Sequence, residues 1–337
     1  MSQRHGLGIV VVVMTMVLIA SSAFAAQSPS ASLKPMRLTV VVGPSVSVVY
    51  AYWVGVTRAI RKVYPQLEFT VMEASGGLDG VKKVRSGQAD FSNTTADLTW
   101  TSFNGEESFK GQPLKDGRVL WCYDLWTYQW AVAKASGVKS LDGLKDKPFN
   151  PGPAGSAMSS LAKSLFKEYG IEARIHDATA AAASEAMQNR QIIGVGKLGP
   201  IPDSYLQQIA TTIPLNIVGL TKDQQKKLTD KYAYFLPVTV PAKAYGESDE
   251  ALTVAVVMGG FATTSLPQEA GYAFFKAMWE GGKGEWQAAL PQAKDNNIPE
   301  LTLKSANLLH AGTVQYLQEK GLKVPERLIP PEYKPVK

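Results

Sequence analysis

The chain alternates between short apolar runs and longer stretches in which apolar residues recur every three or four positions. Residues 37–43 form a β-branched run that ends in glycine, and residues 49–63 then carry the helical spacing. The first pattern predicts a strand and the second an amphipathic helix. The same alternation follows at residues 67–72, 77–85 and 89–93. We therefore predict a parallel sheet covered by helices in this part of the chain.

A second α/β unit begins with the strand-like residues 119–132, and a helical pattern at residues 156–169 ends at Gly170. Further strand and helix patterns lie at residues 178–188, 192–195, 204–210, 239–240, 252–257, 267–279 and 310–320. Two such units and a C-terminal portion suggest a chain that crosses from one lobe to a second and then returns. We predict an α/β fold of two lobes, with a ligand cleft between them.

The first residues have the pattern of a secretory leader. Arg4 precedes an apolar run at residues 8–20, and small residues follow at Ala23 and Ala25. We interpret residues 1–25 as a cleaved signal peptide, because the run is shorter than the roughly 20 residues that a membrane-spanning helix needs. No cysteine directly follows the run as a site for a lipid anchor. We expect export to the periplasm and a flexible lead-in at residues 26–35.

Length and charge narrow the class of protein. About 310 residues follow the leader, which exceeds the usual span of one hydrophobic core and favours two domains. The formal net charge of +6 falls by one with Arg4, and the basic residues are dispersed, so we expect no nucleic-acid partner. A mild positive field favours small anions. We expect a monomer, and we interpret the single cysteine, Cys122, as a buried small hydrophobe rather than a reactive thiol.

The sequence lacks the residues that an enzyme or a metal site requires. His5 lies in the leader, His176 is interpreted as a solvated loop residue, and His310 is interpreted as a helix cap. No Gly-x-Ser-x-Gly motif is present, and no pair of histidines or cysteines has metal-ligand spacing. We therefore predict no catalysis, no metal and no cofactor.

Two turns of small residues and a group of aromatic residues are candidates for ligand binding. Ser45 and Ser156 each precede a predicted helix, where free N–H groups and a partial positive charge suit a carboxylate. Either serine could equally be an ordinary N-cap. The aromatic residues could form the core or wall the cleft. They are Tyr50, Tyr52, Trp53, Trp121, Tyr123, Trp126, Tyr128 and Trp130.

Several motifs occur in one order over nearly all of the chain after the leader. Residues 86–90 have the form Ser-Gly-x-Ala-Asp, residues 109–111 the form Phe-Lys-Gly, and residues 152–158 are close to Gly-x-x-Gly-Ser-Gly-Thr. Related matches lie at residues 43–52, 70–77, 235–245 and 310–316. In order and spacing these motifs resemble the TRAP-associated extracytoplasmic immunogenic (TAXI) family of solute-binding proteins. These are receptors of tripartite ATP-independent periplasmic (TRAP) transporters.

The resemblance implies a type II-like periplasmic binding-protein fold and a small carboxylate ligand. It places residues 36–124 and 237–337 in lobe 1 and residues 125–236 in lobe 2, and it implies that the closed form docks on a TRAP-type permease. Two alternatives are the receptor of an ABC importer and a periplasmic enzyme.

The turns, the aromatic residues and the resemblance together lead us to predict a set of ligand-binding residues. Hydroxyls and helix termini would bind polar groups, two aromatic side chains would pack on carbon, and Lys197 would either pair with a ligand charge or lie on the surface as a solvated cation. The set is Ser45, Ser47, Tyr52, Thr94, Thr95, Trp126, Gly155, Ser156, Ala157, Met158 and Lys197.

Overall fold

A computed structural model describes residues 33–336, apart from residues 46, 155 and 247. The predicted signal peptide lies outside the described residues, as does the lead-in up to residue 32. Leu33, at the end of that lead-in, is packed in the core, and its carbonyl accepts a hydrogen bond from Gln66. Within the described part of the chain, no helix is long and apolar enough to cross a membrane.

The N-terminal elements follow the predicted alternation. Strands β1 (Met36–Val42), β2 (Leu67–Glu73) and β3 (Phe91–Thr95) pair in parallel. Helix α1 (Val48–Val63) packs on one face of these strands with Val40 and Val42, while α2 (Gly77–Arg85) packs on the other with Val41. Helix α3 (Ala96–Asn104), which the apolar pattern does not predict, follows β3 directly. Successive side chains of β1 point to opposite faces of the sheet, so its buried residues face α1 on one side and α2 on the other.

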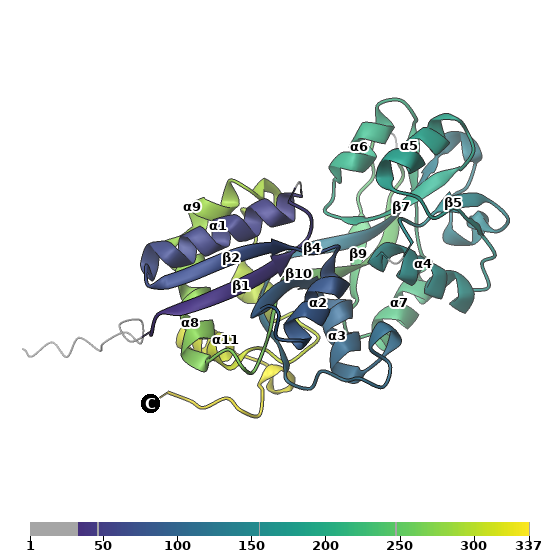
Figure 1. The fold of residues 1–337 in the computed structure, drawn as a ribbon. Helices are drawn as coiled ribbons and strands as arrows, with labels where there is room; N and C mark the ends of the chain where they lie inside the picture. Colours follow the sequence, from purple (N-terminus) through teal and green to yellow (C-terminus); the bar gives the residue numbers. More distant parts are fainter. Residues whose placement is uncertain (1–32, 46, 155, 247, 337) are drawn as a thin grey trace, which may run out of the picture.

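Two long antiparallel strands form the centre of the molecule. Strand β4 (Gly117–Ala133) pairs with β10 (Ala251–Thr263) along most of its length. The register shifts between Met258 and Gly259 and again between Gly260 and Phe261. Such bulges bend a strand and increase its twist. Figure 1 shows β4 running from the half that contains β1 into the half that contains β7.

The second half of the chain adds smaller elements to the far end of this pair. Strands β7 (Gly194–Gly199) and β8 (Leu215–Val218) pair with β4. Strand β9 (Leu236–Val240) pairs with β10. Strand β5 (Pro148–Asn150) lies between β7 and β6 (Arg174–Ile175) and pairs with both. The sheet order is β2-β1-β3-β10-β4-β7-β5-β6, with β8 and β9 off this path. The helices here are α4 (Ala157–Glu168), α5 (Ala180–Gln188), α6 (Ser204–Ala210) and α7 (Lys222–Lys231).

The C-terminal helices return to the first half of the molecule. They are α8 (Gln268–Lys276), α9 (Lys283–Gln287), α10 (Ile298–Thr302) and α11 (Ala311–Glu319). His310 caps α11 and accepts a hydrogen bond from the Gly312 N–H, which confirms its predicted role. His176 is exposed, and Cys122 is buried beside Trp121, as predicted. Burial raises the pKa of the Cys122 thiol, so the side chain is an unreactive hydrophobe.

The division into lobes predicted from the sequence stays a proposal, and we propose to refine one of its boundaries. Val240, Tyr245 and Ala251 belong to a cluster of buried residues that also contains Leu215 and Ile217. These contacts favour a return to lobe 1 within β10 rather than at residue 237. The two places where the chain passes between the lobes would then lie side by side in the β4–β10 pair.

Substitution of Gly312 tests the close contact between α8 and α11. A Cβ at this position would overlap the backbone of Gln268 and Tyr272, which belongs to α8 and cannot move away easily. Gly312→Ala is therefore expected to lower the free energy of unfolding by about 1–3 kcal/mol, measured by urea denaturation. Gly284→Ala, on the exposed surface of α9 with no atom near the added Cβ, is the matched control and should not destabilise. Equal losses in the two variants would contradict this account.

Candidate functional site

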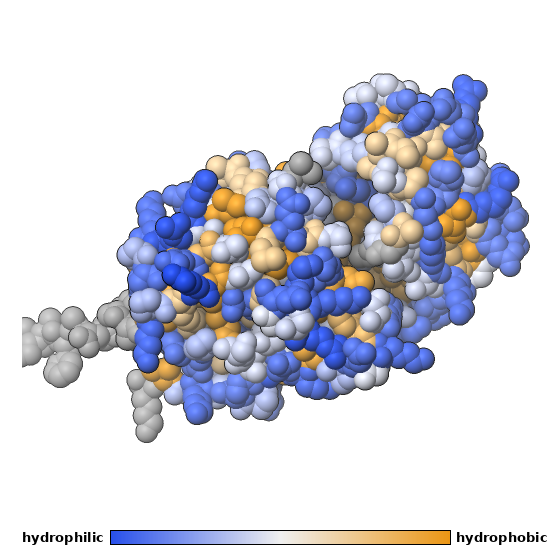
Figure 2. Space-filling model, viewed as in Figure 1, coloured by the Kyte–Doolittle hydropathy of each residue, from blue (hydrophilic) through white to orange (hydrophobic). Residues whose placement is uncertain are grey.

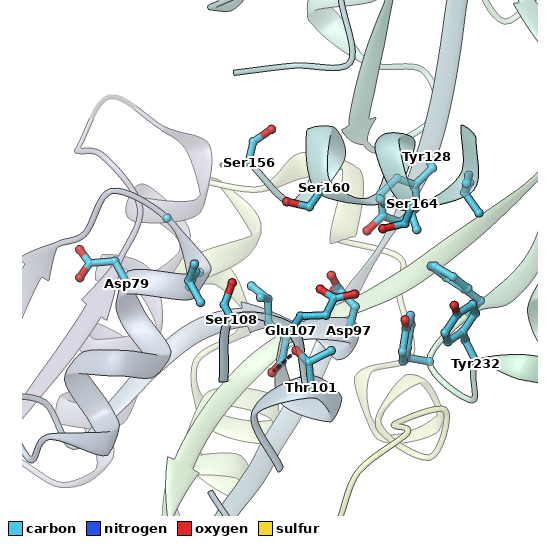
Figure 3. A pocket seen from close by; sticks show the side chains of 18 of the residues that line it. Asp79, Asp97, Thr101, Glu107, Ser108, Tyr128, Ser156, Ser160, Ser164 and Tyr232 are labelled. Atoms are coloured by element: carbon cyan, nitrogen blue, oxygen red, sulfur yellow. Dashed lines mark hydrogen bonds between the residues drawn. The ribbon is translucent and has the colours of Figure 1, made fainter. Parts of the chain in front are cut away.

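A cavity of about 600 Å³ lies between the two halves of the molecule, and Figure 2 shows the hollow between them. One wall comes from α2, α3 and the turn after α3. The opposite wall comes from α4, and the segment before β9 contributes Tyr232, Tyr234 and Phe235. In Figure 3 these two walls face each other across the opening. The site is therefore an interlobe cleft of the kind that the sequence predicts.

Two carboxylates lie next to each other on the α3 wall (Figure 3). Asp97 is in the first turn of α3, and Glu107 follows in a turn where its backbone has a φ of 47°. The Asp97 Oδ1 is buried and has no hydrogen-bond partner among the described residues. Burial raises the pKa of Asp97, against smaller opposing effects of the Thr95 hydroxyl and the backbone N–H groups of Asp97 and Leu98. Burial and the charge of Asp97 raise the pKa of Glu107.

Aromatic side chains line the inner part of the cavity. Tyr128, on β4, is fully buried, yet it lines the cavity, and its hydroxyl makes no hydrogen bond to any described residue. Phe235 packs edge-on against Tyr128, with ring centroids 5.9 Å apart, and against Tyr234 at 4.6 Å. Burial and the charge of Asp97 raise the pKa of both tyrosines, so both phenols keep their protons at neutral pH.

The α4 wall carries hydroxyl groups. Ser156 is the N-cap of α4 and accepts a hydrogen bond of 3.2 Å from the Ser159 N–H. Ser160 and Ser164 follow one and two turns later and also line the cavity (Figure 3). Glu168, at the end of α4, lies 3.4 Å from Lys227 and 3.1 Å from Lys231. This acid therefore has its own counter-charges, unlike Asp97 and Glu107.

Lys197 lies in a second, smaller cavity of about 290 Å³ behind the start of α4. Its Nζ is 3.8 Å from the Asp203 Oδ2 and lies 5.8 Å from the centre of the Tyr205 ring. Met158 lines this second cavity, and Ser156 lines both cavities. Lys197 therefore neither lines the main cavity nor stands as a solvated surface charge, because its side chain is only 35 % exposed and has an anionic partner.

The other predicted site residues are scattered. Ser45 is exposed, Ser47 caps α1 by accepting from the Tyr50 N–H, and neither lines the two cavities. Tyr52 is in the core, where it stacks on Tyr123 and accepts a hydrogen bond from Trp121.

Of the five remaining predicted residues, the structure describes four, which lie at the end of β3, on β4 and at the start of α4. Thr94 and Thr95 are buried and line a space of about 10 Å³ inside the protein. Trp126 donates a hydrogen bond of 3.1 Å to Asp124. Gly155 lies outside the described residues, and Ala157 begins α4.

The sequence analysis missed most of the cavity's lining residues. Asp97 and Glu107 were not chosen as ligand-binding residues. A signal for Asp97 was present, since an acid that directly follows a buried polar strand stands at the end of the sheet where clefts open. Tyr128 was included in the aromatic cluster, for which a core role and a cleft role were both considered.

Comparison with models of protein families shows the family to which the chain belongs. A family model described as "NMT1-like family" matches residues 40–321. The chain belongs to the NMT1-like family. Among solved structures, this NMT1-like protein is similar to the periplasmic aliphatic sulphonate binding protein SsuA from Escherichia coli. The TM-score is 0.50 at 14% identity, covering 85% of this chain and 84% of that one.

A TctC solute binding protein from Polaromonas gives a TM-score of 0.52 at 14% identity, covering 78% of this chain and 90% of that one. At these identities the likeness establishes the fold. The NMT1-like protein has the two-lobed α/β fold of periplasmic solute-binding proteins, as the sequence predicts.

Replacing Asp97 tests the electrostatic environment of the cavity in the ligand-free protein. Its pKa is raised above the ordinary value of 3.8, so the folded state holds the proton more tightly than the unfolded state does. Stability is therefore lost as the pH rises from about 4 through the raised pKa. Asp97→Asn removes this loss and is expected to increase the free energy of unfolding at pH 7 by about 0.5–2 kcal/mol.

Urea denaturation of both proteins over a pH series measures this difference, which should widen as the pH rises. Asp79→Asn is the control with the opposite sign, because the hydrogen bond from Lys83 lowers the pKa of Asp79. That variant should lose stability at pH 7 and approach the wild type in acid. A destabilised Asp97→Asn variant would show that Asp97 has a structural partner instead.

Proposed function

We propose that the protein is a solute-binding receptor that captures a small organic molecule in the interlobe cleft and delivers it to a membrane importer. The observation that carries this proposal is the cavity of about 600 Å³ between two halves joined through the β4–β10 pair. A volume of this size suits a small organic ligand. Bending at the paired strands would bring the α3 and α4 walls together around it.

The partner in this proposal is a TRAP-type permease, and the protein works in the periplasm without catalysing a reaction. The TAXI-like motifs and the likeness to a TctC solute binding protein support this assignment. An ABC importer is the second candidate, because the aliphatic sulphonate binding protein SsuA has the same fold. Neighbouring genes for membrane subunits without an ATPase would favour the TRAP type.

The proposal is tested by extracting small molecules from protein purified under native conditions. We expect mass spectrometry to identify a bound solute. Adding that solute back to unfolded and refolded protein should raise the melting temperature and reduce the radius of gyration in X-ray scattering. The refolded protein without solute is the control. If no solute is released and no compound in a nutrient library raises the melting temperature, the receptor function is wrong.

A carboxylate at the start of α4 is the second part of the proposal. The helix N-terminus and the Ser156 hydroxyl lie on the α4 wall, where a partial positive charge would attract an anionic group. Ser156→Asp is expected to weaken binding of the extracted solute at least tenfold, about 1.4 kcal/mol, by charge repulsion.

The stability of α4 should barely change in that variant, because aspartate is a good N-cap. Ser45→Asp, at an exposed turn that lines neither cavity, is the control and should bind normally. Calorimetry measures both affinities. Unchanged affinity in Ser156→Asp, with an unchanged melting temperature, would leave Ser156 with a capping role alone.

A further inference from the structure

The charges of the main cavity are unbalanced on one wall only. Asp79 lies 2.6 Å from Lys83, and Glu168 is paired with Lys227 and Lys231. Asp97 and Glu107 form no ion pair with any residue that the structure describes. Among the described residues that line the cavity, Lys82 is the one cation, and it is exposed. The α3 wall therefore presents two carboxylates without a counter-charge, Asp97 with a buried Oδ1 and Glu107 exposed.

A second observation points to a ligand at the same place. The Tyr128 side chain is completely buried and lines the cavity, but its hydroxyl has no partner within the described part of the chain. A buried polar group without a partner is costly, so such a group is normally satisfied by water or a ligand. A phenol oxygen can accept a hydrogen bond from a ligand, and the charge of Asp97 acts on this same hydroxyl.

The surrounding rings favour a cation over a neutral donor. Tyr232, Tyr234 and Phe235 line the cavity next to Tyr128, with ring centroids of successive neighbours 4.6 to 5.9 Å apart. Aromatic faces attract organic cations. A bare metal ion is a poor alternative, because no group of three acids, histidines or cysteines able to hold one occurs among the described residues.

We propose that the solute carries a protonated amine or amidine that pairs with Asp97 and Glu107 and contacts the Tyr128 hydroxyl. The inference rests on the proposed receptor function and names the class of its ligand. The cationic group would then lie between the acids of lobe 1 and Tyr128 of lobe 2, and a carboxylate of the same solute would lie at the start of α4. Such a ligand draws the two walls together by contacts with both.

The first test compares matched pairs of probes that differ in an amine. Thermal-shift and calorimetric titrations use 5-aminopentanoate against pentanoate, and phenylalanine against 3-phenylpropanoate, together with analysis of the extracted solute for nitrogen. The amine-bearing member of a pair is expected to bind at least tenfold more tightly. A nitrogen-free extracted solute, or amine-free probes that bind equally well, would overturn the inference while leaving the receptor function intact.

The second test uses variants of the wall, titrated with the extracted solute. Asp97→Asn is expected to weaken its binding about ten- to a hundredfold, because a charge-assisted contact is lost. Glu107→Gln should weaken binding in the same direction. Glu168→Gln is the matched control, since this acid lines the same cavity and is already paired with two lysines. A loss in Glu168→Gln as large as that in Asp97→Asn would also contradict the inference.

The pH dependence of binding distinguishes an ionised Asp97, which would pair with an amine, from a protonated Asp97, which would donate a hydrogen bond to an anion. Its charge acts on three titratable groups, Glu107 after α3, Tyr128 on β4 and Tyr234 before β9. Lys82 on α2 lines the same cavity. An amine ligand should bind more weakly as the pH falls toward the raised pKa of Asp97, because the carboxylate gains a proton. Tighter binding in acid would mean that a protonated Asp97 donates to an anion. Absence of binding by any solute would instead remove the receptor function itself.

Discussion

The antiparallel pairing of β4 with β10 is the interaction on which the rest of the structure depends. Their ladder continues from Thr127 and Ala255 to Gly117 and Thr263. It therefore serves as the central layer of one half of the molecule and as the connection to the other. One cluster of buried residues follows this pair through both halves, from Trp53 in the first to Phe149 in the second, and the cleft opens beside it. The bulges at Gly259 and Gly260 lie within the same ladder, where a change of twist would alter the angle between the walls.

The cleft wall shows a conflict between stability and binding. Carboxylates without counter-charges, an unsatisfied tyrosine hydroxyl and a left-handed backbone at Glu107 each cost free energy in the empty protein. The large aromatic core of the first half, which includes Trp53 and Trp121, offsets such local costs. Groups that destabilise the empty receptor are those that a ligand can satisfy.

The sequence predicted the architecture better than the site. Apolar spacing predicted most strands and helices, because one buried face sets the period of β1, α1 and α4. It missed α7, whose ten residues bury only Leu228. The site was harder, because a cleft forms from elements far apart in the chain. Ser156 lines the cleft, whereas Tyr52 lies in the core. The sequence could not separate these cases for Tyr52, because a core position and a cleft position on a helix can both be occupied by a tyrosine.

The place of β10 in the sheet has a consequence for the order of folding. Strand β3 lies between β1 and β10, yet β10 is synthesised only after the whole second half of the chain. In an exported chain, β3 must therefore wait for that neighbour until the second half of the chain has also crossed the membrane. During this time its buried polar edge has no partner strand, and the apolar surface meant for α8 and α11 is uncovered. We expect the incomplete lobe 1 to need a chaperone most. Lobe 2 should fold before lobe 1 is complete.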